Sequence, residues 1–559
     1  MKTLLLFAAA LMLSPLGAQD LGNIQNEKPV ALSGGLNIQT GFYAMNGAKA
    51  RQPGFTYIVS GSPVISIYGL SLPFSFTFSN YQRDFRQPFN QFGVSPVYKW
   101  ITVHAGYRNI SYSQFGMAGF TVLGGGIELK PKKFRFAVLY GRSQKAVKDD
   151  TSKSIETNLN DITYPTYKRM LFASKIGYGS NNNFIDLHFL SGKDDSSSLP
   201  FRPITSQVMP AKNQVFSTSA KLSFFKKKLI WQGEGGLSVY TRDIAFEEVD
   251  LENKLANSVL KANITSQIYG AYETQLNYTE KKFGVGAKYR RVAPDYKSMG
   301  AYYFQTDFEQ YLGNFKANVM ANKLRFSGSA GIQKDNLLKK KIATTKRSIY
   351  NGVISFVPSA KFGIDVSVAN YGTSQRAGRR NLSDTAVINQ INNSITITPR
   401  YIIVKANIVN TWQLLAGRQS LDDKNRNTEK YTQVNMQFAN LIFVRSNTKT
   451  TFSYNSGLNY NLSQSIAGKI GLAGIIAGCS KGWKNGKFTA DANFSFNMST
   501  YNQEYNGITS NLMCGAGYKI AKKHKVSLSA SGLLNRSKAI EAGSSFEEYF
   551  LKINYGFTL

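Results

Sequence analysis

The stretch FTVLGGGIELKPKKFRFAVLYGR, residues 120–142, predicts the fold of the whole chain. It contains two alternating segments of about ten residues each, joined by the basic turn KPKK. Side chains of a strand alternate between two faces, so one face of the second segment is apolar. That face carries Phe134, Phe136, Val138 and Tyr140. The stretch therefore predicts a hairpin of two strands, each with one apolar side.

The same unit recurs along the chain from about Trp100 onward. Further copies are QVFSTSAKLSFF-KKK-LIWQGEGGLSVY, QIYGAYETQLNYTE-KK-FGVGAKYRR and SIAGKIGLAGIIAGCSKGW-KNG-KFTADANFSF, the last with an Asn485-Gly486 hairpin signal. Longer polar connections lie between the copies, at 147–167, 196–212, 376–391 and 424–432. Short turns that alternate with long loops are typical of a transmembrane β-barrel, with the short turns facing the periplasm.

The predicted fold class is all-β: one large antiparallel transmembrane β-barrel with short periplasmic turns and long extracellular loops. Counting segments predicts about 26 strands, in a range of about 22 to 28 and even-numbered. A secreted array of β-sandwiches or a β-solenoid is the alternative, and the lack of a fixed repeat period disfavours both. We expect one barrel domain, residues 19–559, in the cell outer membrane.

The first residues, MKTLLLFAAALMLSPLGAQD, predict a secretory signal peptide over residues 1–18. Leu16 departs from the small residue usual before such a cleavage site, and no cysteine follows that would favour a lipoprotein anchor. The longest later apolar run, at 470–479, is too short for a transmembrane helix. Only Cys479 and Cys514 occur, so no disulfide framework is expected, and both are predicted to be packing residues.

The strand parity is strained near the beginning of the predicted barrel. If consecutive strands form hairpins, both 74–80 and 100–109 run toward the outside, so the chain between them must cross back toward the periplasm. The connection QRDFRQPFNQFGVSPVYK contains two prolines and little alternation. We expect it to cross back partly as a short strand near Val97 or as a segment inside the lumen.

The segment YFLKINYGFTL, residues 549–559, predicts a final strand with one apolar face. We expect it to pair with a strand near 32–43 and so close the barrel, because a closed barrel has no free edge. The segment resembles the terminal signal that the barrel assembly machinery recognises, although Leu559 replaces the usual phenylalanine. The predicted membrane-insertion signal consists of Tyr555, Phe557 and Leu559.

The net charge of +34 indicates a basic lumen once the apolar faces are turned toward lipid. Like charges around a channel favour anionic solutes. The alternative is a solvated lumen face in a generally basic protein. The opposing inward acids are Asp186, Glu234 and Glu273. The candidate lumen residues are Arg108, Arg135, Lys175, Lys221, Lys288, Arg290, Lys316 and Arg325.

The predicted barrel is too wide to be left open. Some 26 tilted strands give a diameter of roughly 50 Å, so we expect folded-in loops, a flattened barrel or a partner protein to obstruct it. One candidate plug is the loop 244–263, where Leu251, Leu255 and Val259 predict a short amphipathic helix. A solvated surface helix is the alternative.

Catalytic chemistry is not indicated by the sequence. The Asp186-x-His188 pair lies on one predicted inner face, without a recognisable nucleophile motif beside it. Nucleotide-binding loops, dinucleotide fingerprints and Cys/His metal spacings are also missing. We expect no enzyme activity, no cofactor, no metal and no nucleic-acid partner. The expected partners are outer-membrane lipid and lipopolysaccharide, the barrel assembly machinery, and periplasmic or surface proteins.

Three stretches, at 94–109 (VSPVYKWITVHAGYRN), 290–309 (RRVAPDYKSMGAYYFQTDFE) and 328–337 (GSAGIQKDNL), carry a resemblance. Through them the chain resembles large, mostly uncharacterised outer-membrane β-barrel proteins of the Bacteroidota. The resemblance implies the barrel fold and the location, and it transfers no catalytic or binding residue. Two functions follow as hypotheses: a channel or export component with a basic lumen, or an assembly platform for periplasmic or surface partners.

Overall fold

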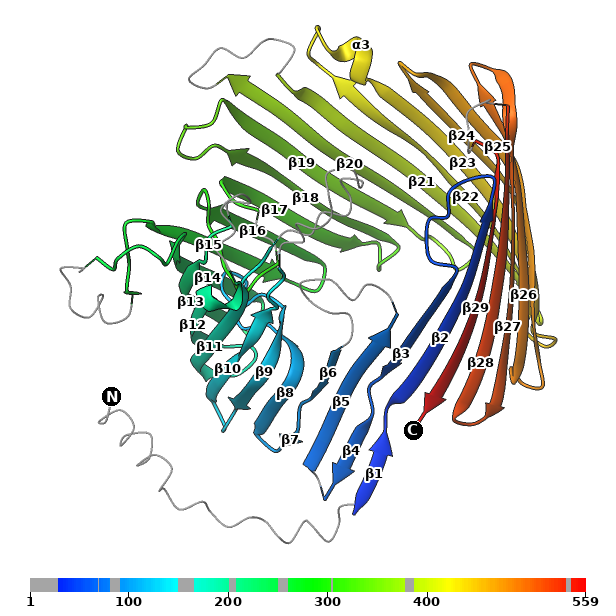
Figure 1. The fold of residues 1–559 in the computed structure, drawn as a ribbon. Helices are drawn as coiled ribbons and strands as arrows, with labels where there is room; N and C mark the ends of the chain where they lie inside the picture. The colour runs from blue at the N-terminus through cyan, green and yellow to red at the C-terminus, as the bar shows by residue number, and fades with distance from the viewer. Residues whose placement is uncertain are drawn as a thin grey trace.

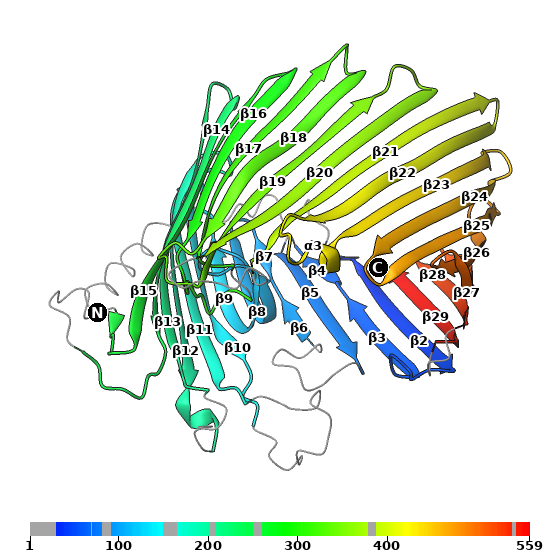
Figure 2. The same ribbon diagram turned by 90° about the horizontal axis from the view of Figure 1, so that it is seen from above.

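The computed structural model describes residues 29–68, 70–80, 91–148, 165–200, 208–249, 260–302, 305–377, 387–538 and 544–559. These residues form one closed antiparallel β-barrel (Figures 1 and 2). The predicted signal peptide, residues 1–18, and most of the predicted plug helix, residues 250–259, lie outside the described ranges. The short helices η3 (Ser196–Ser198) and α3 (Glu429–Thr432) sit in loops.

The barrel wall follows the order of the chain. Its first strands are β1 (Val30–Ser33), β2 (Gly35–Asn46), β3 (Phe55–Gly61), β4 (Val64–Ile67), β5 (Leu70–Ser79), β6 (Gln91–Val94), β7 (Val97–Tyr98), β8 (Ile101–Ile110), β9 (Phe120–Leu129) and β10 (Phe134–Gln144). Next come β11 (Lys168–Gly179), β12 (Phe184–Asp195), β13 (Lys212–Phe224), β14 (Leu229–Thr241), β15 (Ser266–Thr279), β16 (Phe283–Val292), β17 (Phe308–Val319), β18 (Leu324–Asp335), β19 (Ala343–Phe356) and β20 (Phe362–Ala377). The last are β21 (Asn389–Lys405), β22 (Ile408–Asp423), β23 (Val434–Asn447), β24 (Phe452–Ser465), β25 (Gly468–Trp483), β26 (Phe488–Tyr501), β27 (Glu504–Ala521), β28 (His524–Ser537) and β29 (Phe546–Thr558).

The pairing of β29 with β2 closes the barrel, as predicted. Leu36 lies opposite Phe557 and Phe42 opposite Leu551 in this antiparallel ladder. The backbone N–H of Leu559 extends it by donating to the carbonyl oxygen of Gly34 at 3.0 Å. At three positions in the wall, two strand segments lie in line: β1 with β2, β3 with β4, and β6 with β7. When each in-line pair is counted once, the wall has 26 strand positions, which we call staves.

The fourth stave answers the parity problem near the beginning of the barrel. β6 pairs antiparallel with β5 and with β8, and β7 does the same. The connection between β5 and β8 therefore crosses back as a broken strand that includes Val97, as predicted. Its pairing is sparse: β6 meets β8 only at Gly93–Gly106 and Val94–Ala105.

The height of the wall varies around the barrel. β8 and β9 contain 10 residues each, whereas β25 contains 16 and β27 contains 18. The prediction of long loops at one end of the barrel fails beside these tall strands. There, two-residue turns at 466–467 and 502–503 join β24 to β25 and β26 to β27. We call this end the long-loop end and the opposite one the short-turn end.

Alternation gives the wall an apolar outer face. Three of the four predicted outward residues of β10 are exposed, Phe134 at 51%, Val138 at 41% and Tyr140 at 56%, and Phe136 is half-buried; Leu187 on β12 reaches 60%. An aqueous surface would not expose so many large apolar side chains, whereas a lipid-facing surface requires them. Cys479 and Cys514 lie on this face, each opposite Ala492 of β26, and both are exposed rather than packed.

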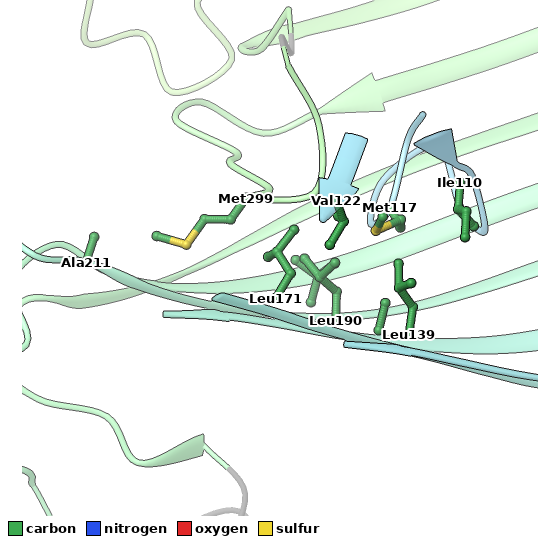
Figure 3. Packing of buried hydrophobic residues seen from close by; sticks show 10 residues of the cluster. Ile110, Met117, Val122, Leu139, Leu171, Leu190, Ala211 and Met299 are labelled. Carbon is green, nitrogen blue, oxygen red and sulfur yellow. The ribbon is translucent and has the colours of Figure 1, made fainter. Parts of the chain in front are cut away.

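A hydrophobic core lies on the inner side of β9 to β13 (Figure 3). In most of a barrel this wide the inner face is solvated, so a buried apolar patch requires a cover. The cover comes from two loops at the long-loop end. The core consists of Ile110, Met117, Val122, Leu139, Leu171, Ala173, Leu190, Ala211, Val215 and Met299.

Candidate functional site

Residues 111–119, between β8 and β9, form the first inner loop. Its Phe115 is fully buried and Met117 is 2% exposed, although both belong to a connection between strands. Met117 packs with Val122 and Leu139 of the wall, and Phe115 packs with Ala271 and Val292. Burying a large apolar side chain stabilises by roughly 2 kcal/mol. The loop is therefore attached to the inner wall rather than suspended in solvent.

Glu234 of β14 holds the tip of the first inner loop. Its Oε1 accepts a hydrogen bond from the Ser113 hydroxyl at 2.6 Å and one from the Phe115 backbone N–H at 3.3 Å. The Ser217 hydroxyl of β13 in turn donates to Ser113 at 2.8 Å. A carboxylate that receives two donors in a buried place fixes the loop more firmly than a neutral acceptor does.

Residues 293–302, which follow β16, form the second inner loop and lock onto the first. The Tyr296 hydroxyl donates to the Phe115 carbonyl at 2.6 Å, and the Ser298 hydroxyl donates to the Gly116 carbonyl at 2.6 Å. The Ala118 N–H donates to the carbonyl of Gly300 at 2.9 Å. Burial raises the pKa of the Tyr296 hydroxyl, so it stays protonated and donates.

Two fully buried polar residues of the wall anchor the second inner loop. The Asn213 side chain accepts from the Met299 N–H at 3.0 Å and donates to the Ser238 hydroxyl at 2.8 Å. Ser238 donates to the Lys297 carbonyl at 2.6 Å. The two inner loops, β13 and β14 thus share one hydrogen-bonded network.

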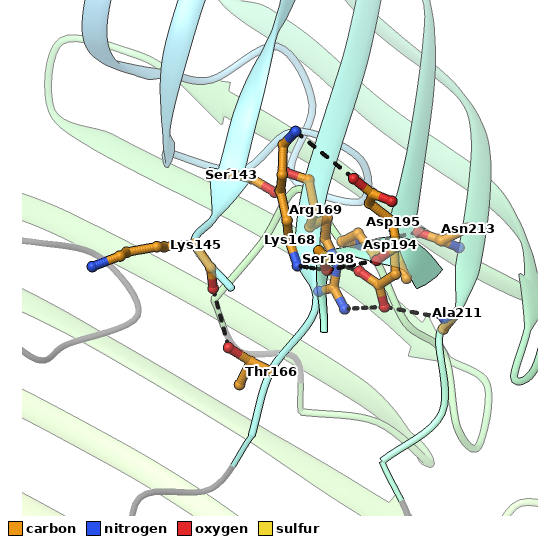
Figure 4. A network of polar contacts seen from close by, with 11 residues as sticks. Ser143, Lys145, Thr166, Lys168, Arg169, Asp194, Asp195, Ser198, Ala211 and Asn213 are labelled. Atoms are coloured by element: carbon orange, nitrogen blue, oxygen red, sulfur yellow. Dashed lines mark hydrogen bonds and ion pairs between the residues drawn. The ribbon is translucent and has the colours of Figure 1, made fainter. Parts of the chain in front are cut away.

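A second polar network fixes the long-loop ends of β10 to β13 (Figure 4). Arg169 binds Asp194 through two bonds, at 2.7 and 3.0 Å, and the Asp194 carboxylate also accepts from the Ala211 N–H at 3.0 Å. Nearby, Lys168 lies 3.8 Å from Asp195. Asp194 is 3% exposed, so this pair ties the strand ends together in a place largely shielded from water.

A belt of charged residues crosses the inner wall on the short-turn side of the first inner loop. Arg135 and Asp186 form an ion pair at 3.1 Å. Glu273 receives both Lys288 at 2.8 Å and Arg290 at 3.3 Å. The sequence predicted a single basic lining. The structure pairs three of its residues, Arg135, Lys288 and Arg290, with acids.

A glycine permits the Arg135–Asp186 pair. The two residues stand on β10 and β12, and Gly177 of β11 lies between them in register. A Cβ atom at position 177 would lie only 1.9 Å from Asp186 Oδ1. The pair therefore reaches across an intervening strand that has no side chain at that position.

A cavity of about 370 Å³ lies between the first inner loop and this charged belt. Its wall brings together Arg135, Lys175 and Lys221 of the predicted set. The Lys175 ammonium stands 4.9 Å from the centre of the Tyr112 ring and is 8% exposed. Asp186 and Glu234 also line the cavity.

The remaining predicted residues lie elsewhere. Arg108 donates to the hydroxyls of Ser95 at 2.6 Å and Ser75 at 2.7 Å, beside the broken stave. Lys316 is opposite Gly284 and Arg325 is opposite Ser355, both outside the cavity. In β29 the hydroxyl of Tyr555 is 2.7 Å from His524 Nδ1, and Phe557 and Leu559 adjoin the closing ladder.

Mostly neutral polar residues line the wall farther along the chain, with the charged Asp491, Lys519 and Lys525 toward its short-turn end. They alternate with the exposed apolar residues of β24 to β28, such as Leu458 and Phe494. Asn459 donates to Asn497 at 2.6 Å across Gly474, which repeats the glycine-bridged arrangement seen at Gly177. The residues of this neutral wall include Asn455, Asn459, Asn461, Asn493, Ser495, Asn497, Ser499, Thr509, Asn511, Ser527, Ser529, Ser531 and Asn535.

His188 and Ser219 lie as close together as the histidine and serine of a serine hydrolase. His188 Nε2 is 2.9 Å from the Ser219 hydroxyl. The third group of a triad does not match, because Asp186 pairs with Arg135 and His188 Nδ1 is buried without a hydrogen-bond partner. The arrangement therefore lacks the carboxylate that would orient the imidazole.

The two inner loops were not predicted from the sequence, yet a signal was present. The run Phe136–Tyr140 is apolar on both faces, which is typical of a strand covered on both sides. The loops themselves carry Phe115, Met117, Tyr296 and Met299 with few charges. The amphipathic pattern favoured the loop 244–263 instead. The structure describes only the two ends of that loop, where Glu248 and Asn263 form a β-bridge.

Within the described ranges, no group of three or more His, Cys, Asp or Glu side chains is arranged to hold a metal ion. The helices in the same ranges are all too short or too polar to cross a membrane.

The fold and its two faces define the class: a large transmembrane β-barrel. No family model matches the chain, and no curated protein matches it. The P pilus usher (PapC) translocation pore is similar at 9% identity, with 94% of this chain and 99% of that chain covered and a TM-score of 0.38. An Escherichia coli P pilus tip assembly intermediate, PapC-PapD-PapK-PapG, is similar at 10% identity, with 94% and 61% covered and a TM-score of 0.44.

Pseudomonas aeruginosa OpdQ is similar at 11% identity, with 69% of this chain and 98% of that chain covered and a TM-score of 0.34. At such scores these likenesses support no inference about cargo or partners.

Proposed function

We propose that this chain is an outer-membrane channel, or an export component, that passes hydrophilic material and favours anions. The observation that carries the proposal is the divided lumen: a neutral polar wall on β24 to β28 faces a wall that holds two inner loops and a charged belt. A polar inner face is what a water-filled passage requires. The resemblance to outer-membrane barrels of the Bacteroidota agrees with this location.

The anion preference is expected to come from the basic residues of the lumen. Arg108, Lys221, Lys316 and Arg325 add positive charge beyond the pairs already described. Positive charge along a low-dielectric wall raises the local concentration of anions.

Planar-bilayer recordings test both parts of the proposal. We expect stable channels whose reversal potential indicates anion preference, and loss of that preference when Arg135, Lys221, Lys288 and Arg325 are all changed to Gln. The matched control changes four exposed turn lysines, Lys226, Lys227, Lys484 and Lys522, to Gln and should keep the preference. Anion selectivity that survives the lumen changes would contradict a role for these residues.

Conductance also tests the inner loops as the obstruction. Replacing residues 112–117 with a Gly-Ser linker of equal length should increase single-channel conductance, because the cover of the inner wall is lost. The control is a variant that lacks residues 250–259, which belong to the loop between β14 and β15. Folding is checked in each case by heat-modifiable migration.

A second candidate function, an assembly platform, is favoured by the short-turn end. Exposed lysines occupy most of its turns and form a basic rim that suits an acidic periplasmic partner. Absence of channels in bilayers would favour the platform, provided that a periplasmic protein is recovered with the unchanged chain but not with the variant in which Lys226, Lys227, Lys484 and Lys522 are changed to Gln. The rim lysines are Lys132, Lys133, Lys226, Lys227, Lys281, Lys282, Lys323, Lys361, Lys449, Lys484, Lys487, Lys522 and Lys523.

A further inference from the structure

We propose that the cavity beneath the first inner loop binds an oxyanion group of a solute: a phosphate, a sulfate or a carboxylate. The proposal deepens the proposed function, since it names a chemical class and a place for the solute, and it rests on that function only for the route by which the solute arrives.

The charges around the cavity favour an anion. Arg135, Lys175 and Lys221 line it on the side of β10 to β13, where Asp186 is the acid that lines it with them. Glu128 also faces Lys175, but it already contacts His104 at 3.4 Å and Lys130 at 3.1 Å.

The acids on the far wall already have partners. Glu234 accepts from the first inner loop, and Glu273 is held by Lys288 and Arg290. The donors to Glu234 are neutral, so its charge remains, whereas Lys288 and Arg290 offset Glu273. With these two partners counted, five basic residues stand against the three acids Asp186, Glu234 and Glu273, and a net positive charge remains around the cavity.

Two donors in the cavity wall lack a partner among the residues that the structure describes. Arg135 uses Nη2 for Asp186, and its Nη1 is buried without a hydrogen-bond partner. The hydroxyl of Tyr112, in the first inner loop, is likewise buried without one. Burial raises the pKa of Tyr112, so this hydroxyl stays protonated and is able to donate. Buried donors are normally satisfied, so both point to a group that they bind.

The side chains also fit the geometry of an oxyanion. A guanidinium offers a planar pair of N–H groups that matches two oxygens of a phosphate or a carboxylate. Phe184 lies under the Arg135 guanidinium at 4.1 Å and restricts its orientation. Lys175 and Lys221 supply charge from either side.

The size of the cavity limits the ligand. At about 370 Å³ it is at the lower end of small-molecule sites, so it holds an anionic group with a few attached atoms. Both a free oxyanion and the phosphate of a lipid headgroup have this chemistry, and the experiment separates them.

Calorimetry on the intact chain in detergent tests the proposal, with inorganic phosphate as the probe at constant ionic strength. We expect saturable binding that weakens at least tenfold in the double variant Arg135→Gln and Lys221→Gln. The control, Lys339→Gln with Lys340→Gln in the exposed connection between β18 and β19, should bind as the unchanged chain does. Tyr112→Phe keeps the ring beside Lys175 and should weaken binding by roughly threefold.

A second arm titrates the same variants with micelles of a short-chain phosphatidic acid. Tighter binding of this lipid than of phosphate, lost in the same double variant, identifies a headgroup site; equal or weaker binding identifies a free-solute site. Binding that is undetectable for both probes, or equal in the double variant and the control, overturns the proposal. Channels that conduct without binding phosphate overturn this inference alone, and binding without channels overturns the proposed conduction alone.

Discussion

Glycines on the inner wall decide which polar side chains meet. Gly177 lets Arg135 reach Asp186, and Gly474 lets Asn459 reach Asn497, in each case across a whole strand. Gly236 serves a different purpose, because a Cβ there would approach Phe115 Cβ and the Tyr296 hydroxyl oxygen at 2.9 Å each. The absence of a side chain is thus what admits both the ion pair and the inner loops.

The change Gly177→Val should disrupt the Arg135–Asp186 pair, because the valine would occupy the place of the carboxylate. Breaking a largely buried pair costs about 3 kcal/mol, so the free energy of unfolding in guanidinium should fall by about that amount. Gly235→Val is the control, since its Cβ would point to the open outer face. Equal stability of the two variants would refute the role given to Gly177.

The change Glu234→Ala should release the tip of the first inner loop, because the Ser113 hydroxyl loses its acceptor and the Phe115 N–H is left with the Ser113 oxygen at 3.2 Å. Leaving a buried donor unsatisfied costs about 1–3 kcal/mol, which corresponds to amide exchange about 5- to 150-fold faster over residues 113–116. Glu280→Gln, in an exposed turn, should leave this exchange unchanged. Protection that persists in Glu234→Ala would show that apolar packing alone holds the loop.

At the scale of the strand, alternation was sufficient to predict most of the wall. It gave the outward face of β10 and the closing contact between β29 and β2. It failed where tertiary cover overrides the pattern: the inner apolar residues Leu139 and Leu171 make sense only once the loops lie on them. Which loop folds inward depends on contacts between segments far apart in the chain, so local pattern could not select it.

The two faces of β29 allow a direct test of the insertion signal. Changing Tyr555 and Phe557 to Asp puts two charges on the lipid-facing side, where a charged side chain costs up to about 2–4 kcal/mol for Lys or Arg at mid-bilayer and less for Asp. We expect loss of the heat-modifiable barrel form in membranes. The control Asn554→Asp places a charge one residue away on the opposite face and should insert. Normal insertion of the double variant would exclude these residues as a signal.

At the scale of the whole barrel, strand pairing is uneven. β21 and β22 pair along most of their length, from Gln390–Asp423 to Lys405–Ile408, whereas β7 meets β8 only at Val97–Thr102 and Tyr98–Ile101. The sequence predicted that the chain crosses back between β5 and β8. It could not predict how weakly the stave would pair, because pairing depends on two neighbours at once.

Hydrogen exchange on the folded barrel should detect this weak stave. Amides of residues 91–98 should exchange at least about tenfold faster than those at the centres of β21 and β22, because fewer ladder bonds must open. Bilayer-embedded samples exclude an effect of detergent. Uniform protection around the barrel would show that the lipid, rather than the ladder, sets local stability.

The broken stave also has a consequence for the surrounding lipid. A strand needs about 9–11 residues to cross the hydrocarbon layer, while β6 and β7 provide 4 and 2 and β27 provides 18. Because β6 and β7 lie in line over residues 91–98, the wall there is slightly shorter than a spanning strand, and we expect the bilayer to thin slightly beside it. The barrel thereby acquires a distinct flank in the plane of the membrane, where we expect a preference for lipids with shorter chains.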